Sequence, residues 1–362
     1  MKMRNCEDIK QYNKILMYGI GNQFKECYKI FKREKVLLFD GNPEKTGIQI
    51  SDGNVIHSSD EISKYYDKES CIVISSISHQ YEIAKFLVEE KGISTTDIFM
   101  YTSEWYESNV YKRDLIDQNW SKIVRYSEKF ADEESRRYYL NAIMARKERN
   151  PLLLKPNSNC ISVNEYADIV KLEKDDRIID CGAYTGDTAE LYLKKLNGEC
   201  QIYAIEPYKE NYLKMQERIC NNNWGDKVKT FNCAVGNERK KIALSYNEGD
   251  FGMAISVSNK NGKENQDVEV ETLDHLLRDK HITYIKMDIE GEERNALAGA
   301  KELIKKNKPK LMISAYHKIE DFWELPEIIW DVNPNYKIYV GHAPNVSTEM
   351  EFYCIDGEMV EK

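Results

Sequence analysis

Two strand ends in the second half of the chain carry residues whose types and order could bind a nucleoside-like cofactor. Residues 178–186 read Ile-Ile-Asp-Cys-Gly-Ala-Tyr-Thr-Gly, a β-branched apolar run with Asp180 at its end, followed by a glycine turn. Gly182 would let the backbone turn tightly and come close to a ligand. Asp187 and Thr188 predict a helix start, whose free N–H groups and positive dipole end would point back at the turn.

The spacing of this turn favours S-adenosylmethionine over a dinucleotide. A dinucleotide fold carries G-x-G-x-x-G here, because a pyrophosphate sits on the helix N-terminus. This chain has Asp180-x-Gly182-x-x-x-Gly186 instead, and a carboxylate would repel a pyrophosphate but suits a cofactor that carries an amine and a sulfonium. The next predicted strand, 201–205, ends at Glu206, which could accept both ribose hydroxyls. The alternative is a generic α/β turn whose acids cap helices.

A third segment, Lys286-x-Asp288-x-Glu290, follows the apolar start of another predicted strand. Alternation with a period of two would send all three side chains to one side, where burial without partners is costly. We predict a polar site for an acceptor hydroxyl, the alternative being an internal salt-bridged cluster. His317 ends the following predicted strand and is, with Asp288, a candidate proton acceptor. Asp288, Glu290 and His317 would also suit a divalent site of the magnesium type, but such carboxylate pairs are more often plain hydrogen-bonding groups, and no metal is predicted.

The elements that must position these residues alternate between strands and helices. This order predicts a doubly wound, mostly parallel Rossmann-like sheet, with 337–340 and 351–354 as an antiparallel edge hairpin. Ligands bind such sheets outside the carboxyl ends of the strands, where the candidate residues lie. We also expect one helix over 293–307 and a strand-rich insert over 241–257. Residues 241–265 and the N-terminal domain are the expected acceptor selectors, because loops over the strand ends can change without disturbing the core.

The N-terminal third predicts a second Rossmann-like α/β domain. Gly19-x-Gly21 follows a predicted strand, and Asp40 ends the next one. Phe24 stands where the dinucleotide fingerprint has its third glycine, so a structural or partner-docking domain is favoured. A NAD or nucleotide-sugar site at this turn is the alternative.

Composition restricts the class of protein. The 362 residues carry a formal net charge of −9, with 52 basic and 61 acidic residues, which disfavours a nucleic-acid partner. Nine scattered cysteines without a C-x-x-C pair predict reduced thiols rather than a disulfide framework or a zinc site. No apolar run is long enough to span a membrane, and the N-terminus lacks an apolar signal core. A soluble cytoplasmic protein is expected.

Several of these motifs resemble those of a known family. The run from Tyr284 to Ala300, Lys-Met-Asp-Ile-Glu-Gly-Glu-Glu at its centre, is similar to the signature of the FkbM family of S-adenosylmethionine-dependent methyltransferases. So are 180–187, Thr272-Leu-Asp274 and Ser314-Ala-Tyr-His-Lys. The resemblance implies an O-methyltransferase for hydroxyls of sugars and other secondary products. The expected domains are an N-terminal Rossmann-like domain (1–102), a helical connector (103–156) and a methyltransferase domain (157–362).

The resemblance and the strand ends together give each candidate residue a role. Lys286 and Glu290 would orient the acceptor, while Asp288 or His317 takes its proton. The expected cofactor-binding residues hold the methionine end, the ribose (Glu206) and the adenine (the last two): Asp180, Gly182, Ala183, Tyr184, Gly186, Asp187, Thr188, Glu206, Asn232 and Ala234. The expected partner is a small-molecule or glycan acceptor, with homo-oligomerisation left open. The alternatives are an enzyme that uses the N-terminal turn and a non-catalytic scaffold.

Overall fold

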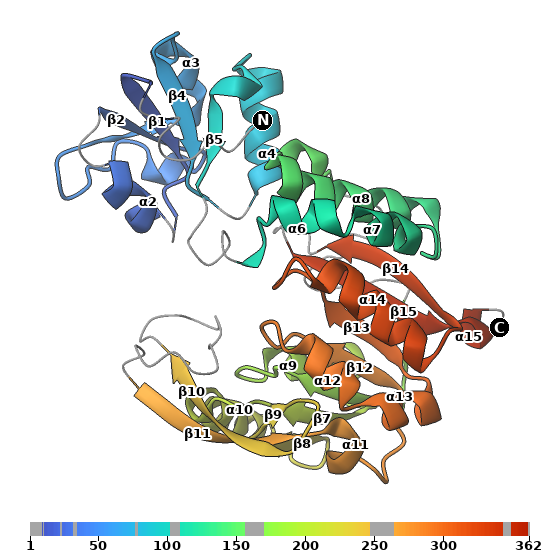
Figure 1. Cartoon of the computed structure of the whole chain (residues 1–362). Coiled ribbons are helices and arrows are strands. Elements are labelled where there is room, and N and C mark those ends of the chain that lie inside the picture. Colours follow the sequence, from blue (N-terminus) through green and yellow to red (C-terminus); the bar gives the residue numbers. More distant parts are fainter. Residues whose placement is uncertain are drawn as a thin grey trace. The chain divides into compact units, whose positions relative to one another are not determined.

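The structure is a computed structural model that describes residues 9, 11–21, 24–31, 35–76, 79–101, 109–155, 170–246, 264–342 and 349–360. The chain divides into two compact units (Figure 1). Unit 1 comprises Met1–Ser121, Arg137–Asn157 and His342–Glu349, and unit 2 comprises Lys122–Arg136, Ser158–Gly341 and Met350–Lys362. The expected domain limits, 102/103 and 156/157, lie outside the described residues and stay predictions.

Unit 1 is built on a five-stranded parallel sheet with the strand order β3-β2-β1-β4-β5. Its strands are apolar and buried, which confirms the Rossmann-like N-terminal sheet. They are β1 (Lys14–Tyr18), β2 (Val36–Asp40), β3 (Ile56–Ser58), β4 (Ser70–Ile74) and β5 (Ile98–Met100). The helices of this part are α2 (Phe24–Phe31), α3 (Ile62–Tyr65) and α4 (Gln80–Lys85), with short turns at Pro43–Lys45, Ser59–Glu61, Phe86–Glu90 and Thr95–Asp97.

The described part of the expected connector is helical, as predicted. It holds α6 (Arg113–Gln118), α7 (Trp120–Ser127) and α8 (Glu133–Glu148), followed by a short turn at Pro151–Leu153. Proline at the first position of that turn, with the Asn150 side chain accepting from the Leu152 N–H, ends the helical region as expected. Trp105 and Tyr106 lie outside the described residues.

Unit 2 contains a seven-stranded sheet with the order β14-β15-β13-β12-β6-β7-β8, which confirms the doubly wound, mostly parallel arrangement. The strands β13, β12, β6, β7 and β8 are parallel, and β15, next to the edge strand β14, runs antiparallel to β13. The strands are β6 (Arg177–Cys181), β7 (Gln201–Ile205), β8 (Val228–Phe231), β12 (Tyr284–Met287), β13 (Lys310–Ser314), β14 (Tyr336–His342) and β15 (Met350–Asp356). A short helix, α15 (Gly357–Val360), follows the last strand.

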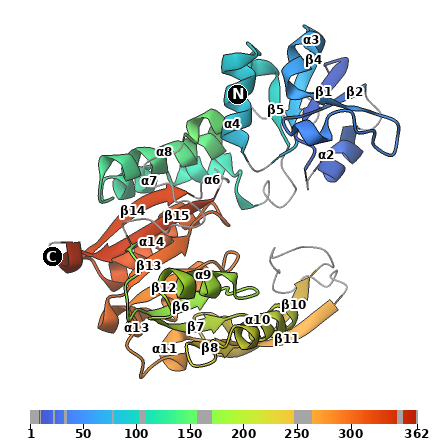
Figure 2. The ribbon, with the colours of Figure 1, turned by 180° about the vertical axis from the view of Figure 1, so that it is seen from behind.

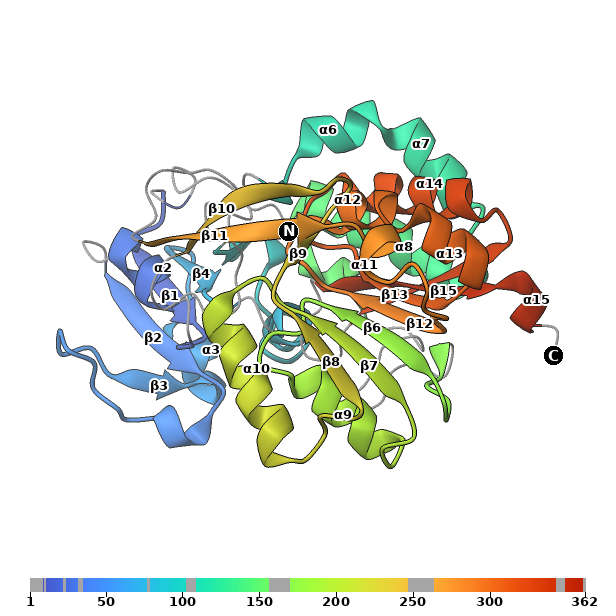
Figure 3. The same ribbon diagram turned by 90° about the horizontal axis from the view of Figure 1, so that it is seen from below.

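Helices cover both faces of this sheet. Helices α9 (Asp187–Lys195) and α10 (Lys209–Asn221) lie on one face, and α12 (Glu293–Ala298), α13 (Lys301–Asn307) and α14 (Asp321–Val332) lie on the other (Figure 3). The view from behind shows α9 and α10 in front of the strands (Figure 2). The site therefore has a rigid sheet between two helical layers as its base.

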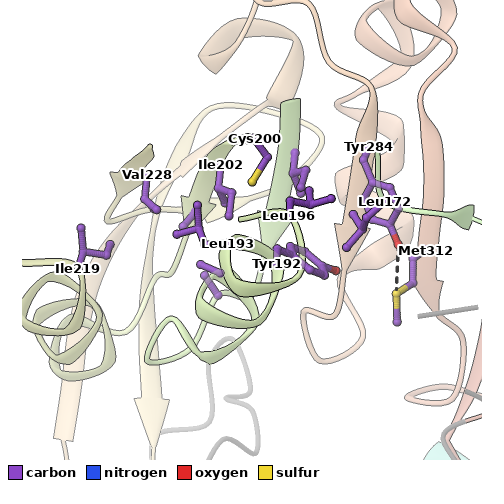
Figure 4. Close-up of a cluster of buried hydrophobic side chains, with 14 of the residues drawn as sticks. Leu172, Tyr192, Leu193, Leu196, Cys200, Ile202, Ile219, Val228, Tyr284 and Met312 are labelled. Carbon is purple, nitrogen blue, oxygen red and sulfur yellow. Dashed lines mark hydrogen bonds between the residues drawn. The ribbon is translucent and has the colours of Figure 1, made fainter. Parts of the chain in front are cut away.

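The packing of α9 shows why the chain is helical there. Its buried residues Ala189, Tyr192 and Leu193 recur at helical spacing and pack on β6 and β7 (Figure 4). Full burial of a side chain such as Leu193 contributes about 1.5–3 kcal/mol. Beyond them Tyr284 donates a hydrogen bond to Met312 Sδ (3.6 Å), which ties β12 to β13 beneath the site.

One expectation needs correction. The single helix over 293–307 is two helices, which separate at Gly299, where the Gly236 carbonyl oxygen lies 2.0 Å from the position of a Cβ, and Asp274 accepts the N–H groups of Glu302 and Leu303 in the first turn of α13.

The described part of the expected strand-rich insert is a strand, β10 (Lys240–Tyr246). It forms a small three-stranded sheet, β10-β11-β9, with β11 (Glu264–Glu271) and β9 (Ala234–Val235). Residues 247–263, with the expected Gly249–Gly252 segment, lie outside the described residues. The short helix α11 (Leu273–Leu276) follows β11.

Candidate active site

A buried ion pair joins the two central strands of the unit 2 sheet. Asp180 of β6 is opposite Lys286 of β12 in the parallel register, and Lys286 Nζ lies 3.2 Å from Asp180 Oδ1. Burial raises the pKa of Asp180, while the Lys286 ammonium acts in the opposite direction. Lys286 Nζ also donates to the Gly182 carbonyl (3.1 Å). Lys286, expected to orient an acceptor, thus holds the turn after β6 through a charge and a hydrogen bond.

A neighbouring loop leaves no room for a side chain at Gly182. Its φ is +78°, and a Cβ would lie 1.9 Å from the Asp288 carbonyl oxygen. From the sequence we expected a ligand to come close to Gly182. In the structure the backbone of the loop after β12 lies against Gly182 instead. The glycine therefore lets the turn after β6 pack directly against the loop that carries Asp288.

Glu206, at the end of β7, fixes the rest of that turn. Its two carboxylate oxygens accept the N–H groups of Tyr184 (3.0 Å) and Tyr208 (2.9 Å). Burial raises the pKa of Glu206 to about 7, although these two hydrogen bonds lower it. Asn232 in turn donates to the carbonyl oxygens of Glu206 (2.9 Å) and Pro207 (3.1 Å). The first three strand ends are thus connected by hydrogen bonds.

The turn itself has the geometry that a helix N-terminus needs. Tyr184 and Gly186 have positive φ values of 46° and 80°, and Gly186 precedes the first residue of α9. A Cβ at Gly186 would lie 3.0 Å from Met215 Cγ, so α10 also packs close to this turn. Ala183 is fully buried, and its N–H donates to the Ile205 carbonyl (3.0 Å).

A hollow of about 200 Å³ opens beside these strand ends. Six of the predicted site residues line it. They are Gly182, Tyr184, Asp187, Thr188, Lys286 and Asp288, together with Met287, Met312, Ser314 and Glu351, which were not predicted as site residues. The other predicted residues are not among its lining residues. Ala234 belongs to the small sheet, where β9 pairs it with Val270 of β11.

Glu351 is the main site residue that the sequence missed. It lies opposite Ser314 in the antiparallel pairing of β13 and β15, so both reach the same hollow. Burial raises the pKa of Glu351 to about 7, while the Tyr353 hydroxyl, which donates to its carboxylate, lowers it. Only the strand order brings Glu351 here, and no local motif marks it.

The loop after β12 departs from the expected alternation. The strand ends at Met287, the Asp288 N–H donates to the Cys181 carbonyl (3.1 Å), and Glu290 adopts φ +60°. The prediction that Lys286, Asp288 and Glu290 leave one strand on one side was therefore wrong. Lys286 points at the buried Asp180, while Asp288 and Glu290 come from an irregular loop and are each about one third exposed.

His317 meets this loop in a cluster of carboxylates. Its Nδ1 lies 3.1 Å from Glu293, and its Nε2 lies 3.3 Å from Glu290 and 3.6 Å from Asp288. Burial of His317 disfavours the cation, but the charges and contacts of Glu293, Glu290 and Asp288 outweigh it and raise the pKa well above the usual value. The raised pKa favours the imidazolium, which has no free nitrogen lone pair, and this argues against His317 as the proton acceptor.

The N-terminal turn is occupied by its own side chains. Asp40, where a ribose-binding acid was considered, accepts the N–H groups of Ile20 (2.7 Å) and Asn42 (2.8 Å) and pairs with Lys45 (3.1 Å). Both oxygens of the carboxylate thus hold the turn, which favours the structural interpretation of this domain.

None of the described helices has the length and apolar composition that a membrane span needs.

Comparison with known proteins agrees with this site. The model of the methyltransferase FkbM domain matches residues 180–337, and no curated protein sequence matches the chain. The crystal structure of methyltransferase FkbM from Methylobacillus flagellatus is 19% identical, with a TM-score of 0.69 over 95% of this chain and 90% of that one, and shows a shared fold.

More distant solved structures were also found. Fibrillarin of Aeropyrum pernix, solved with natively bound S-adenosyl-L-methionine, has 8% identity and a TM-score of 0.34 over 52% of this chain and 69% of that one. An S-adenosylmethionine-dependent O-methyltransferase of Thermotoga maritima has 10% identity and a TM-score of 0.35 over 52% and 62%. The domain match begins at Asp180 and includes the turn, the Lys286–Glu290 segment and His317. Residues 180–337 therefore form an FkbM methyltransferase domain.

Proposed function

We propose that the protein transfers a methyl group from S-adenosylmethionine to a hydroxyl of a sugar, a glycan or a glycosylated metabolite. The observation that carries this proposal is the hydrogen-bonded turn after β6, held between the Asp180–Lys286 pair and Glu206, with a hollow beside it that three further carboxylates line. The FkbM methyltransferase domain supports the reaction class.

The residues of the turn suit the chemistry of this cofactor. Glu206 uses each carboxylate oxygen for one backbone N–H and keeps lone pairs for ribose hydroxyls. Asp187 and Asp288 line the hollow and match the positive charge of an amine and a sulfonium. Asn232 and Ala234 remain the proposed adenine neighbours. When bound, S-adenosylmethionine supplies an electrophilic methyl group.

The chain must orient an acceptor hydroxyl and remove its proton. Besides Asp187, which belongs to the turn after β6, two carboxylates line the hollow: Asp288, which the sequence predicted, and Glu351, which it did not. Positioning of the hydroxyl contributes roughly 7–11 kcal/mol, and a general base contributes about 10²–10⁴-fold. Loss of one carboxylate is therefore expected to slow the reaction strongly without abolishing it. Glu290, beside Asp288, is the proposed acceptor-orienting residue.

The proposal also covers the selection of the acceptor, the cellular location and the oligomeric state. The small β10–β11–β9 sheet and the residues between β10 and β11 are the proposed acceptor selectors, because loops over strand ends vary without disturbing a core. A cytoplasmic location and homo-oligomerisation stay predictions from sequence.

The first test is calorimetric titration of the full chain with S-adenosylmethionine. We expect micromolar binding that Glu206→Gln weakens about tenfold or more, because the amide offers one acceptor oxygen where the carboxylate offers two. Glu210→Gln is the matched control, since Glu210 is an exposed partner of Lys214 on the adjacent helix. Radiolabelled methyl transfer to a panel of sugars and glycosides then identifies the acceptor. Absence of binding in the wild type, with NAD(H) or a nucleotide-sugar binding instead, would refute the proposal.

A further inference from the structure

Beside the methyl-transfer hollow, three carboxylates surround one buried imidazole. His317 is 2% exposed and has Glu293 on the Nδ1 side and Glu290 and Asp288 on the Nε2 side. Glu293 is fully buried, whereas Asp288 and Glu290 are each about one third exposed. One imidazole cation can balance only one of these three charges, so the cluster has an excess of negative charge next to the hollow.

The distances around Nε2 fit the first coordination sphere of a metal ion. Nitrogen and carboxylate ligands lie about 2.0–2.2 Å from a divalent transition metal, which places neighbouring ligand atoms about 2.8–3.1 Å apart in octahedral geometry and about 3.3–3.6 Å apart in tetrahedral geometry. Nε2 lies 3.3 Å from Glu290 Oε2 and 3.6 Å from Asp288 Oδ1. Small rotations of the partly exposed Asp288 and Glu290 side chains would let both carboxylates bind the same ion as Nε2.

The hydrogen bonding of His317 is a second, independent observation. Neither ring nitrogen forms a hydrogen bond of regular geometry with any residue in the part of the chain that the structure describes, although carboxylate oxygens lie close to both. Glu293 Oε1, 3.1 Å from Nδ1, has the position of the carboxylate that orients a metal-bound histidine from behind. Asp288, Glu293 and His317 offer atoms within 4.8 Å of one another.

We propose that His317 Nε2, Asp288 and Glu290 form a binding site for a divalent transition-metal ion, with Glu293 as the residue that positions the histidine. One nitrogen and two carboxylate ligands suit manganese- or zinc-like ions better than magnesium, which prefers oxygen ligands alone. Only the neutral imidazole binds a metal, so Nε2 releases its proton when the ion enters.

The site also gives the cluster a role in the proposed reaction, and this part rests on the proposed function. Asp288 lines the hollow, so an ion held by it would lie next to the hollow proposed for the acceptor hydroxyl. A metal-bound hydroxyl loses its proton more easily. Asp288 would then be a ligand and Asp187 is assigned to the cofactor, so Glu351 is the carboxylate of the hollow proposed to accept the proton.

Manganese binding to the metal-stripped full chain tests the site without any acceptor. Titration with Mn²⁺ is followed by the electron paramagnetic resonance of the free ion, and pulsed measurements detect an imidazole nitrogen coupled to the bound ion. We expect one saturable Mn²⁺ per chain with nitrogen coupling, and a Kd that rises about tenfold or more in Asp288→Asn and Glu290→Gln. Because the Glu290 side chain is partly exposed, we expect Glu290→Gln to fold normally, and thermal unfolding checks this.

Glu292→Gln is the matched control, because Glu292 belongs to the same loop but faces Lys318 (3.6 Å) and lies outside the proposed ligand set. Its Kd for Mn²⁺ should equal that of the wild type. No saturable binding, equal affinity in Glu290→Gln and the control, or no nitrogen coupling would each overturn the proposal. Calorimetry with S-adenosylmethionine on the same metal-free protein tests the proposed function separately.

Discussion

Lys286 Nζ lies 3.2 Å from Asp180 Oδ1 between the two central strands of the methyltransferase sheet. The Lys286 side chain is 10% exposed and that of Asp180 is fully buried, so water screens neither charge effectively. The same ammonium holds the Gly182 carbonyl. The pair therefore joins two strands of the sheet, and its ammonium also holds the turn after β6.

Removal of one member of this pair should destabilise the protein more than removal of both. Lys286→Met leaves a buried carboxylate without a counter-charge, and Asp180→Asn leaves a buried ammonium, each at a cost of about 3–5 kcal/mol. The double variant removes both charges and should lose clearly less than the sum of the two single changes. Urea unfolding of the four proteins gives the coupling free energy. Additive losses would show that the two groups do not depend on each other.

Gly182→Ala should disrupt the site by steric conflict and not only by backbone strain. The new Cβ would lie 1.9 Å from the Asp288 carbonyl oxygen, so either the turn or the Asp288 loop must move. Gly198→Ala is a matched control, since Gly198 has a similar φ of +73° but no atom within 4 Å of the new Cβ.

The left-handed backbone strain, about 1–2 kcal/mol, is common to both alanine variants. We therefore expect Gly198→Ala to lose about that much stability and to bind S-adenosylmethionine normally, whereas Gly182→Ala loses more stability and most of its affinity. Thermal unfolding and calorimetry compare the two. Equal effects on affinity would contradict a specific role for the Gly182–Asp288 contact.

The sequence predicted those parts of the site that one strand and its turn determine. Asp180, Gly182 and Glu206 are local features, because a buried strand followed by a glycine or an acid fixes where that residue lies. Glu351 and Glu293 reach the site only through the β13–β15 register and the approach of α12 to His317. The break at Gly299 depends in the same way on the Gly236 carbonyl of a distant segment. Side chains that tertiary contacts bring together have no local pattern from which to predict them.

Cofactor affinity should increase with pH around neutrality through Glu206. Burial raises its pKa to about 7, so the carboxyl is mostly protonated at pH 6 and mostly ionised at pH 8. The ionised form accepts hydrogen bonds at both oxygens, and we expect S-adenosylmethionine to bind up to about tenfold more tightly at pH 8 than at pH 6. Calorimetry at the two pH values measures this change, which Glu206→Gln should reduce. An identical pH dependence in the variant would assign the titration to another group.

Glu351 should make the folded protein less stable as pH rises towards neutrality. Burial raises its pKa to about 7 from the model-peptide value of 4.5, so between these values the folded state holds a proton that the unfolded state has released. The free energy of unfolding then falls by up to about 1.4 kcal/mol per pH unit for this group, and the loss is complete above pH 7. Glu351→Gln, which carries no titrating proton, should show a smaller decrease in urea unfolding between pH 5 and pH 8.

Tyr353→Phe should strengthen the pH dependence of stability that Glu351→Gln weakens. The Tyr353 hydroxyl donates to Glu351 and lowers its pKa, so its removal should raise the pKa further and extend the loss of stability to higher pH. Urea unfolding at pH 7 to 9 would detect that extension, and a ¹³C resonance of the Glu351 carboxyl would follow its titration directly. If the titration of Glu351 lies near pH 4.5 in both proteins, this carboxyl is fully ionised at neutral pH. It would then be a weaker base for a sugar hydroxyl than a group with a pKa near 7, because proton transfer is most efficient when the pKa matches the working pH.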